Sequence, residues 1–151
     1  MIAFLAWSLF AVLVAIAALH LYWAAGGMWP AHDEHGLARM VVGAANEAMP
    51  PKALTIVVAL VIATAAFVPL WVAGLLSLPF DGALPSWART TVCFAGGLVF
   101  GLRGSVGLTP QWARLLPKEP FASLNRRFYS PLCIGLGLGF AAIALSAVDQ
   151  S

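Results

Sequence analysis

Residues 20–30, HLYWAAGGMWP, end the first long apolar run of the chain and gather a histidine, a tyrosine, two tryptophans and a glycine pair. The run begins at Ile2 and contains no Asp, Glu, Lys or Arg before this end. A membrane-spanning helix needs about 20 mostly apolar residues, whereas the apolar part of a signal peptide has about 7–15. Glycine and proline end helices, and tyrosine and tryptophan favour the water–lipid interface. The stretch therefore predicts a retained spanning helix over residues 2–25.

The composition excludes an ordinary water-soluble domain. Of the 151 residues, 62% are hydrophobic and 9% are charged, whereas soluble domains carry about 25% charged residues. Because so few charges cannot cover a water-facing surface, much of the surface must contact lipid. The net charge of +2 is too small to indicate binding to nucleic acid, and we expect no nucleic-acid partner.

Three further apolar segments follow the first, and none alternates polar with apolar residues as a spanning strand would. Since a helix satisfies its backbone hydrogen bonds internally, each segment is expected to be a helix. The four expected helices cover residues 2–25, 53–76, 89–108 and 129–148. The predicted fold is an all-α integral membrane four-helix bundle, formed by residues 1–151 as a single transmembrane domain.

The basic residues predict how these helices are oriented. With four spans, the first and third connections lie on one side of the membrane, and seven of the eight Lys and Arg residues belong to that side: Arg39, Lys52, Arg103, Arg114, Lys118, Arg126 and Arg127. The opposite side holds Arg89. Because Lys and Arg gather in cytoplasmic connections, both termini are expected on the non-cytoplasmic side.

Two motifs carry a resemblance to a known family. They are His20-x-Tyr22-Trp23-x-x-Gly26-Gly27-x-Trp29-Pro30 and Tyr129-Ser130-Pro131-Leu132-Cys133. Together they resemble an uncharacterised family of bacterial four-helix integral membrane proteins, a domain of unknown function. The resemblance covers most of the chain, including an arginine late in the third expected helix and the approach to the fourth over residues 121–127. It implies a four-helix architecture in the bacterial cytoplasmic (inner) membrane, and it implies no activity, substrate or cofactor.

Several polar side chains should reach one depth on the cytoplasmic side. His20 lies six residues before Gly26, about 9 Å inside the end of its helix, and Arg103 lies five residues before Leu108, about 8 Å inside. Ionisable residues within a span usually face the bundle interior or a cavity. We therefore expect one pocket in the cytoplasmic leaflet. Its candidate ligand-binding residues are His20, Tyr22, Trp23, Arg103, Arg126 and Tyr129.

Each candidate also has a purely structural interpretation. Arg103 could extend to lipid phosphates, and His20 could bond a carbonyl or hydroxyl group within the core. Tyr22, Trp23 and Tyr129 could anchor helix ends at the interface. Arg126 could act as a positively charged anchor at the cytoplasmic face of the membrane. The sequence leaves both interpretations open.

Residues 32–35, His-Asp-Glu-His, could present two histidines to a metal ion from one helical face. Since no further histidine and no cysteine lies outside the expected spans, a solvated loop is the stronger interpretation, and we predict neither a metal site nor a cofactor. A short interfacial helix is expected over residues 33–48. Its apolar side would hold Leu37, Met40, Val41 and Ala44, and Asn46 and Glu47 could fold over the pocket.

Glycines four residues apart occur in the third and fourth expected helices, as Gly97 with Gly101 and Gly135 with Gly139. Small residues at this spacing let helix backbones approach closely in lipid. The pattern therefore predicts helix packing within the bundle.

The two cysteines should lie at opposite depths, because Cys93 is near the outer end of its helix and Cys133 is near the cytoplasmic end. A disulfide needs Cα atoms within about 7 Å. Both cysteines are therefore predicted to be free thiols.

Three classes of function remain open from the sequence. The first is a protein that binds a small amphipathic or lipid-like molecule in the expected pocket. The second is an accessory subunit of a larger membrane complex, or a homo-oligomer. The third is a membrane-embedded isomerase or cyclase, in which His20 or Tyr129 moves a proton and Arg103 stabilises negative charge. Membrane lipids are expected partners in every case.

Overall fold

The computed structural model describes residues 1–43, 48–79 and 81–148, and within these ranges the chain is helical and contains no strand. Its four long helices are α1 (Ile2–Ala24), α3 (Lys52–Val72), α4 (Ser86–Gly107) and α7 (Ser130–Val148). The shorter elements are α2 (Glu34–Val41), η1 (Asp81–Ala83), α5 (Pro110–Leu115), α6 (Phe121–Leu124) and the π-helical turn η2 (Asn125–Tyr129). The all-helical prediction is therefore confirmed for the described residues.

Three helices are long and apolar enough to cross a membrane: α1, α3 and the continuous helix Phe121–Val148, which joins α6, η2 and α7. α4 has 22 residues, but it contains Arg89 and Arg103 and falls outside this group by composition. Length and composition thus support three of the four predicted spans.

α1 ends at the predicted glycine pair. Gly26 has a φ of +97°, a left-handed conformation that glycine adopts without steric cost. The N–H of Gly27 then donates to the carbonyl of Tyr22 at 2.9 Å, which satisfies a carbonyl that the helix end would otherwise leave free. The ring of Tyr22 lies where a Cβ atom on Gly27 would be. Glycine is therefore required at both positions, for different reasons.

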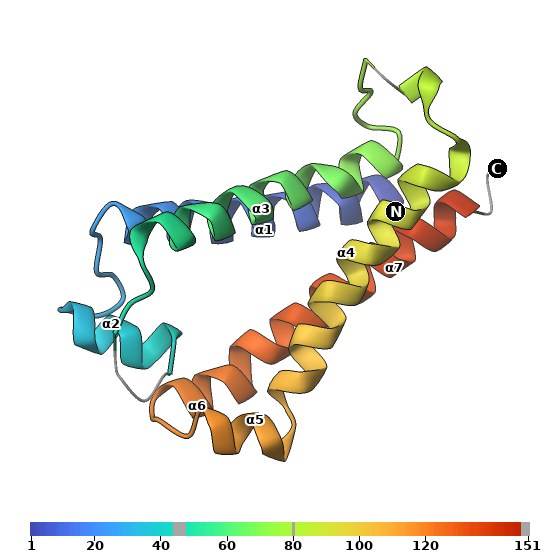
Figure 1. The fold of residues 1–151 in the computed structure, drawn as a ribbon. Helices are drawn as coiled ribbons and strands as arrows, with labels where there is room; N and C mark the ends of the chain where they lie inside the picture. Colours follow the sequence, from blue (N-terminus) through green and yellow to red (C-terminus); the bar gives the residue numbers. More distant parts are fainter. Residues whose placement is uncertain (44–47, 80, 149–151) are drawn as a thin grey trace.

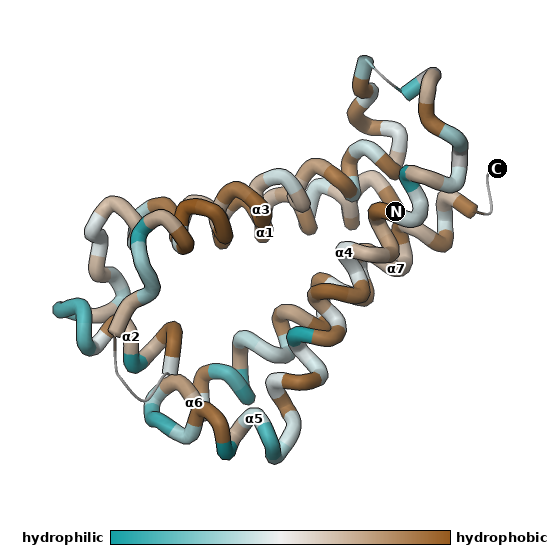
Figure 2. Tube along the Cα trace, viewed as in Figure 1, coloured by the Kyte–Doolittle hydropathy of each residue, from teal (hydrophilic) through white to brown (hydrophobic). Residues whose placement is uncertain are grey.

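The long helices form two hairpins, in which α1 pairs with α3 and α4 pairs with α7 (Figure 1). The hairpins meet near the chain termini and diverge toward the opposite end, where α2, α5 and α6 lie (Figure 1). In place of a closed bundle, the protein thus has two helix pairs whose main contact lies at one end. Hydrophobic residues follow both hairpins, and hydrophilic residues gather around α2, α5 and α6 (Figure 2).

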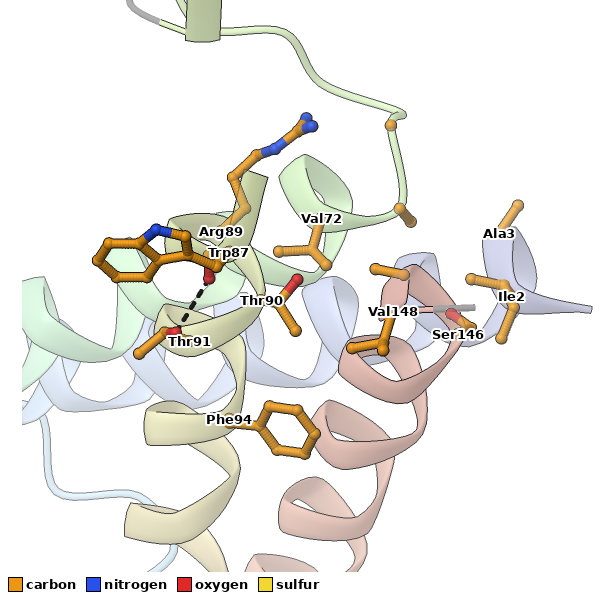
Figure 3. Close-up of a pocket in the computed structure, with 13 residues that line it drawn as sticks. Ile2, Ala3, Val72, Trp87, Arg89, Thr90, Thr91, Phe94, Ser146 and Val148 are labelled. Atoms are coloured by element: carbon orange, nitrogen blue, oxygen red, sulfur yellow. Dashed lines mark hydrogen bonds between the residues drawn. The ribbon is translucent and has the colours of Figure 1, made fainter. Parts of the chain in front are cut away.

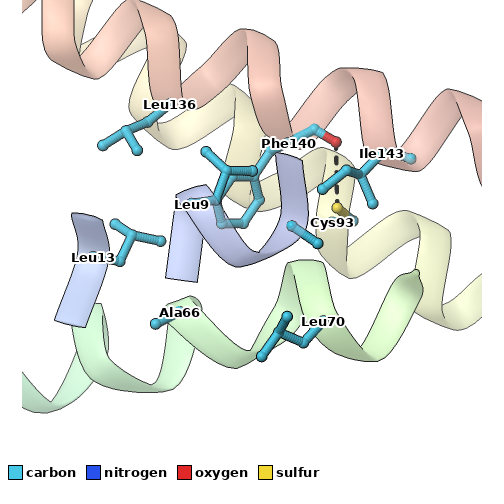
Figure 4. Close-up of a cluster of buried hydrophobic side chains, with 10 residues drawn as sticks. Leu9, Leu13, Ala66, Leu70, Cys93, Leu136, Phe140 and Ile143 are labelled. Atoms are coloured by element: carbon cyan, nitrogen blue, oxygen red, sulfur yellow. Dashed lines mark hydrogen bonds between the residues drawn. The ribbon is translucent and has the colours of Figure 1, made fainter. Parts of the chain in front are cut away.

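The main hydrophobic core lies where the hairpins meet. Side chains from all four long helices contribute to it, and Phe140 and Ile143 of α7 are fully buried (Figure 4). Cys93 of α4 is buried there too, and its Sγ atom donates to the carbonyl of Phe140 at 3.3 Å. The other cysteine, Cys133, is partly buried, and both are free thiols as predicted.

Glycines hold the α4–α7 hairpin together. A Cβ atom on Gly137 would lie 2.8 Å from the backbone nitrogen of Gly101 and 2.9 Å from the carbonyl oxygen of Gly97. The first predicted pair, Gly97 and Gly101, is therefore at the contact between the helices. Of the second pair, Gly139 packs against Leu9 of α1, whereas Gly135 has open space beside it.

A second, smaller contact joins the diverging ends of the hairpins through α2 and α6. Gly43, with a φ of +68°, follows α2 and lies against the ring of Phe121. The hydroxyl group of Tyr129 donates to the carbonyl of Met40 at 3.1 Å. We call these four residues the α2–α6 bridge.

The short helix expected over residues 33–48 is α2, and it is shorter than expected because it ends at Val41. Asp33 caps it, because its Oδ1 atom accepts a hydrogen bond from the N–H of Gly36 at 2.6 Å. Leu37 is buried. The expectations for Ala44, Asn46 and Glu47 fall outside the described residues.

Candidate functional site

The six candidate residues occupy different surroundings, because they lie on hairpins that diverge at this end of the molecule (Figure 1). His20, Tyr22 and Trp23 belong to α1, Arg103 belongs to α4, and Arg126 and Tyr129 belong to η2. Similar depth along the helices therefore does not place His20 and Arg103 in a common cavity. Each cluster has its own geometry.

The imidazole of His20 is held by its own helix. Its Nδ1 atom lies 2.8 Å from the carbonyl oxygen of Ile16, and its ring stacks at a tilt on Trp23 with centroids 5.2 Å apart. His20 lines a small cavity of about 160 Å³ between α1, α3 and the end of α2. The other residues around this cavity are Trp23, Val41, Val42, Met49, Pro50, Leu54, Thr55 and Val58.

Tyr22 and Trp23 fasten the chain that follows α1. The indole N–H of Trp23 donates to the carbonyl of Trp29 at 2.8 Å. The backbone N–H of Trp29 points to the hydroxyl oxygen of Tyr22 at 3.5 Å. Trp29 itself is exposed. The polar atoms of both aromatic side chains thus hold the loop in place.

Arg103 is held by side chains of neighbouring elements. Its Nη2 atom donates to Oδ1 of Asn125 at 3.2 Å, and its guanidinium lies 4.8 Å from the ring centroid of Trp112. Its Nη1 atom is buried without a hydrogen-bond partner among the described residues, and so is Nε1 of Trp112. Both atoms can only donate. Two buried donors therefore lie close together with no acceptor from the described chain.

Asn125 connects this cluster to the end of α4 and the start of α7. Its Nδ2 atom donates to the carbonyl of Gly107 at the end of α4 at 2.6 Å, and its Oδ1 atom also accepts from Oγ of Ser130 at 3.2 Å. Asn125 is 3% exposed and Ser130 is fully buried. A Cβ atom on Gly107 would lie 2.6 Å from Nη1 of Arg103, so glycine makes room for the guanidinium there.

Sequence reasoning missed Trp112, Asn125 and Ser130 as parts of this cluster. Thr109 and Pro110 are a cap and a first-turn residue that could have predicted α5, and the Oγ atom of Thr109 does accept from the N–H of Trp112 at 3.2 Å. No sequence signal indicated that α5 would turn its tryptophan toward α4.

A cavity of about 440 Å³ lies beside this cluster, between the end of α4, α5 and the start of the last helix. Trp112 and Asn125 line it, together with the exposed residues Arg126 and Arg127. The one carboxylate on its wall, Glu119, accepts hydrogen bonds from Ser123. The cavity therefore combines positive charge with hydrogen-bond donors, which suits a ligand that carries acceptor oxygens.

Tyr129 belongs to neither cavity. Its hydroxyl group donates to the carbonyl of Met40, and its ring centroid lies 6.0 Å from the ring centroid of Phe121. The position of Tyr129 between α2 and η2 makes it a link between the hairpins.

A third cavity, of about 850 Å³, lies at the opposite end, where the chain termini and all four long helices come together (Figure 3). Thr90 and Phe94 point toward it, whereas the guanidinium of Arg89 extends away from Phe94 and Val148 (Figure 3). The hydroxyl group of Thr91 is satisfied by the carbonyl of Trp87 at 2.9 Å. This cavity lies far from the predicted site.

No metal site emerges from the described residues, which contain no group of three or more His, Cys, Asp or Glu side chains that could hold an ion. The turn His32 to His35 instead supplies the cap of α2 through Asp33.

The fold defines the class of this protein: within the described residues it is all-helical, with three helices long and apolar enough to cross a membrane. The chain matches the family described as "Protein of unknown function (DUF3995)" over residues 13–140, and it belongs to that family. The predicted resemblance to an uncharacterised family is thereby confirmed. No curated protein and no solved structure matches the chain.

Proposed function

We propose that this is an integral membrane protein with four spanning helices that binds a small amphipathic or lipid-like molecule beside Arg103. The proposed membrane is the bacterial cytoplasmic membrane, with both termini on its outer side. Support for α4 as the fourth span comes from its 22 residues and its close pairing with α7. The two ionisable residues that lower its hydropathy lie toward its two ends, at Arg89 and Arg103.

The unpartnered donors of Arg103 and Trp112 are the observation that carries the ligand proposal. A buried donor left without an acceptor costs about 1–3 kcal/mol, and more when the group is charged. Buried polar atoms without partners are rare in native proteins and call for a missing water, ion or ligand. An oxygen-rich group, such as a phosphate, carboxylate or carbonyl, would satisfy both donors at once.

The surroundings support an amphipathic ligand. The cavity volume of about 440 Å³ falls within the usual range of about 300–1,000 Å³ for small-molecule sites. Its walls include apolar side chains such as Leu108, Leu116 and Phe121 beside the polar groups. A molecule with an oxygen-bearing head and an apolar body would match both kinds of wall.

Mass spectrometry of the protein purified in mild detergent tests the proposal. A small molecule should co-purify in a stoichiometric amount and should be lost from the Arg103→Ala variant. Trp112→Phe, which keeps the aromatic ring but removes Nε1, should reduce retention about tenfold, because a hydrogen bond to a charged group contributes about 1.5–3 kcal/mol. The matched control is Arg114→Ala, which removes an exposed arginine from α5.

Two outcomes would contradict the proposal. Equal retention by the wild type, Arg103→Ala and Trp112→Phe would place any bound molecule elsewhere. A stoichiometric protein in place of a small molecule would favour an accessory subunit. A topology reporter fused after Ser151 tests the orientation separately, and it should report that the C-terminus lies outside the cytoplasm.

A further inference from the structure

The cavity beside His20 has the opposite hydrogen-bonding character to the cavity beside Arg103. A carbonyl oxygen can only accept hydrogen bonds, so the contact of 2.8 Å between Ile16 and Nδ1 of His20 requires the hydrogen to be on Nδ1. In the neutral imidazole, Nε2 then carries a lone pair and can only accept. The helix itself therefore fixes which nitrogen of His20 is the acceptor.

No side chain of the described residues uses that acceptor. The ring of His20 is partly exposed. The two other side chains of the cavity that can donate already have partners, because the indole N–H of Trp23 donates to the carbonyl of Trp29 at 2.8 Å and the hydroxyl group of Thr55 donates to the carbonyl of Pro51 at 3.4 Å. The remaining walls are predominantly apolar. An imidazole within a spanning helix normally finds a partner or serves a ligand, and here the described residues supply a partner for Nδ1 alone.

We propose that Nε2 of His20 accepts a hydrogen bond from the hydroxyl group of a long-chain alcohol or neutral lipid, at a second site separate from the cavity lined by Trp112 and Asn125. A charged ammonium donor is disfavoured, because an apolar cavity does not compensate for the loss of hydration of an ion. A hydroxyl group brings a donor without a charge. The site thus favours a neutral amphipathic molecule that carries a hydroxyl group as hydrogen-bond donor.

The shape of the cavity indicates how such a molecule enters. Its volume of about 160 Å³ is below the usual range for a whole ligand, so it holds the polar end of a chain molecule. Leu54 is 52% exposed and Val58 is 37% exposed, and these two residues of α3 form the outer side of the cavity. The apolar chain of the ligand would continue over them into the bilayer.

Photolabelling with two matched probes tests the inference. One probe is a sixteen-carbon alcohol with a diazirine near its hydroxyl group, and the other is its methyl ether, which has no donor. In lipid nanodiscs the alcohol should label residues of α2 and α3 about fivefold more than the ether, the ratio that one net hydrogen bond provides. This comparison uses the wild-type protein and depends on no variant.

Variants of His20 then assign the acceptor. His20→Phe keeps a ring but has no lone pair, so both probes should label it equally. His20→Gln keeps an acceptor and should retain part of the preference for the alcohol. Arg103→Ala should leave the preference unchanged, which separates this inference from the proposed Arg103 site. Equal labelling of the wild type by both probes, or an undiminished preference in His20→Phe, would overturn the inference.

Discussion

The two hairpins bring their helices together through different small residues. In the α1–α3 hairpin the buried small residues are alanines, namely Ala6, Ala17, Ala59 and Ala66. In the α4–α7 hairpin glycines predominate, and Gly137 lies directly against the backbone of Gly97 and Gly101. An alanine contact leaves one methyl group between each pair of backbones, whereas a glycine contact lets the backbones touch.

This difference decides what each hairpin can bury at its diverging end. The glycine contact continues through Gly104 to Gly107, where close approach brings Ser130, Asn125 and Arg103 into one hydrogen-bonded cluster. The alanine contact ends at His20, whose Nδ1 bonds within its own helix. Backbone contact thus gives the α4–α7 hairpin a polar network between helices, while His20 Nδ1 and Trp23 Nε1 of α1 bond within the same helix or to the loop that follows it.

The largest expected effect comes from placing a methyl group in the glycine contact. Gly137→Ala should lower the free energy of unfolding by about 3 kcal/mol, because its Cβ atom would lie within 2.8 Å of the Gly101 backbone and the helices would have to separate. The matched control is Gly135→Ala, which meets open space and should be neutral or stabilising by up to about 1 kcal/mol through helix propensity. Denaturation in detergent, followed by circular dichroism, measures both. Equal effects would show that the glycine contact does not hold this hairpin together.

The second effect concerns the polar network that only the α4–α7 hairpin contains. Asn125→Ala should lower the free energy of unfolding by about 2 kcal/mol, because it leaves the carbonyl of Gly107 and the donors of Arg103 and Ser130 without partners. Gln111→Ala removes an exposed amide from α5 and should change stability by less than about 0.5 kcal/mol. A loss from Asn125→Ala as small as that from Gln111→Ala would mean that the network contributes nothing.

The third effect concerns the local hydrogen bonds at the end of α1. Trp23→Phe keeps an aromatic ring but loses the bond from Nε1 to the carbonyl of Trp29, so it should cost about 1 kcal/mol. Trp7→Phe makes the same change at an exposed position and should cost less. The unfolding midpoints of the two variants give the comparison. A larger loss of stability from Trp7→Phe than from Trp23→Phe would contradict the assignment of Trp23 as the residue that holds the loop after α1.

The smallest effect is a pH dependence in the connection between the hairpins. Hydrogen bonds from the N–H of Leu78 and the indole of Trp71, with the positive charge of Arg89 contributing less, lower the pKa of Asp81. Because the folded pKa is the lower one, the carboxylate stabilises the fold above its ordinary pKa of about 4, and this contribution is lost as pH falls through the folded value. The melting temperature of the wild type should exceed that of Asp81→Asn at pH 7, and the gap should shrink below about pH 4. A gap independent of pH would exclude ionisation of Asp81 as its cause.

The sequence predicted the helices well because their formation in lipid depends on local properties. A long apolar segment in a bilayer satisfies its backbone groups as a helix, so the runs beginning near Ile2 and Lys52 specify α1 and α3 without reference to the rest of the chain. The glycine pair at the end of α1 and the depth difference between Cys93 and Cys133 are local in the same sense. The structure bears out the ends of these helices to within a few residues.

Which residues come together at the candidate site depended on tertiary structure. Helix rise gives the depth of His20 and Arg103, but depth does not specify which hairpin a residue faces or whether the hairpins diverge. The same limit applies to the glycines, since spacing along one helix does not show that Gly137, and not Gly135, meets α4. Trp112 enters the Arg103 cluster only because α5 folds back beneath α4.

What the amino-acid sequence by itself determined is an all-helical chain with segments fit to cross a membrane, because every residue of such a segment meets the same apolar solvent. What only the tertiary structure decided is the separation of His20 from Arg103 and the pairing of Arg103 with Asn125 and Trp112. Those contacts join residues far apart in the chain, and they depend on how closely the glycines of α4 and α7 let two backbones approach.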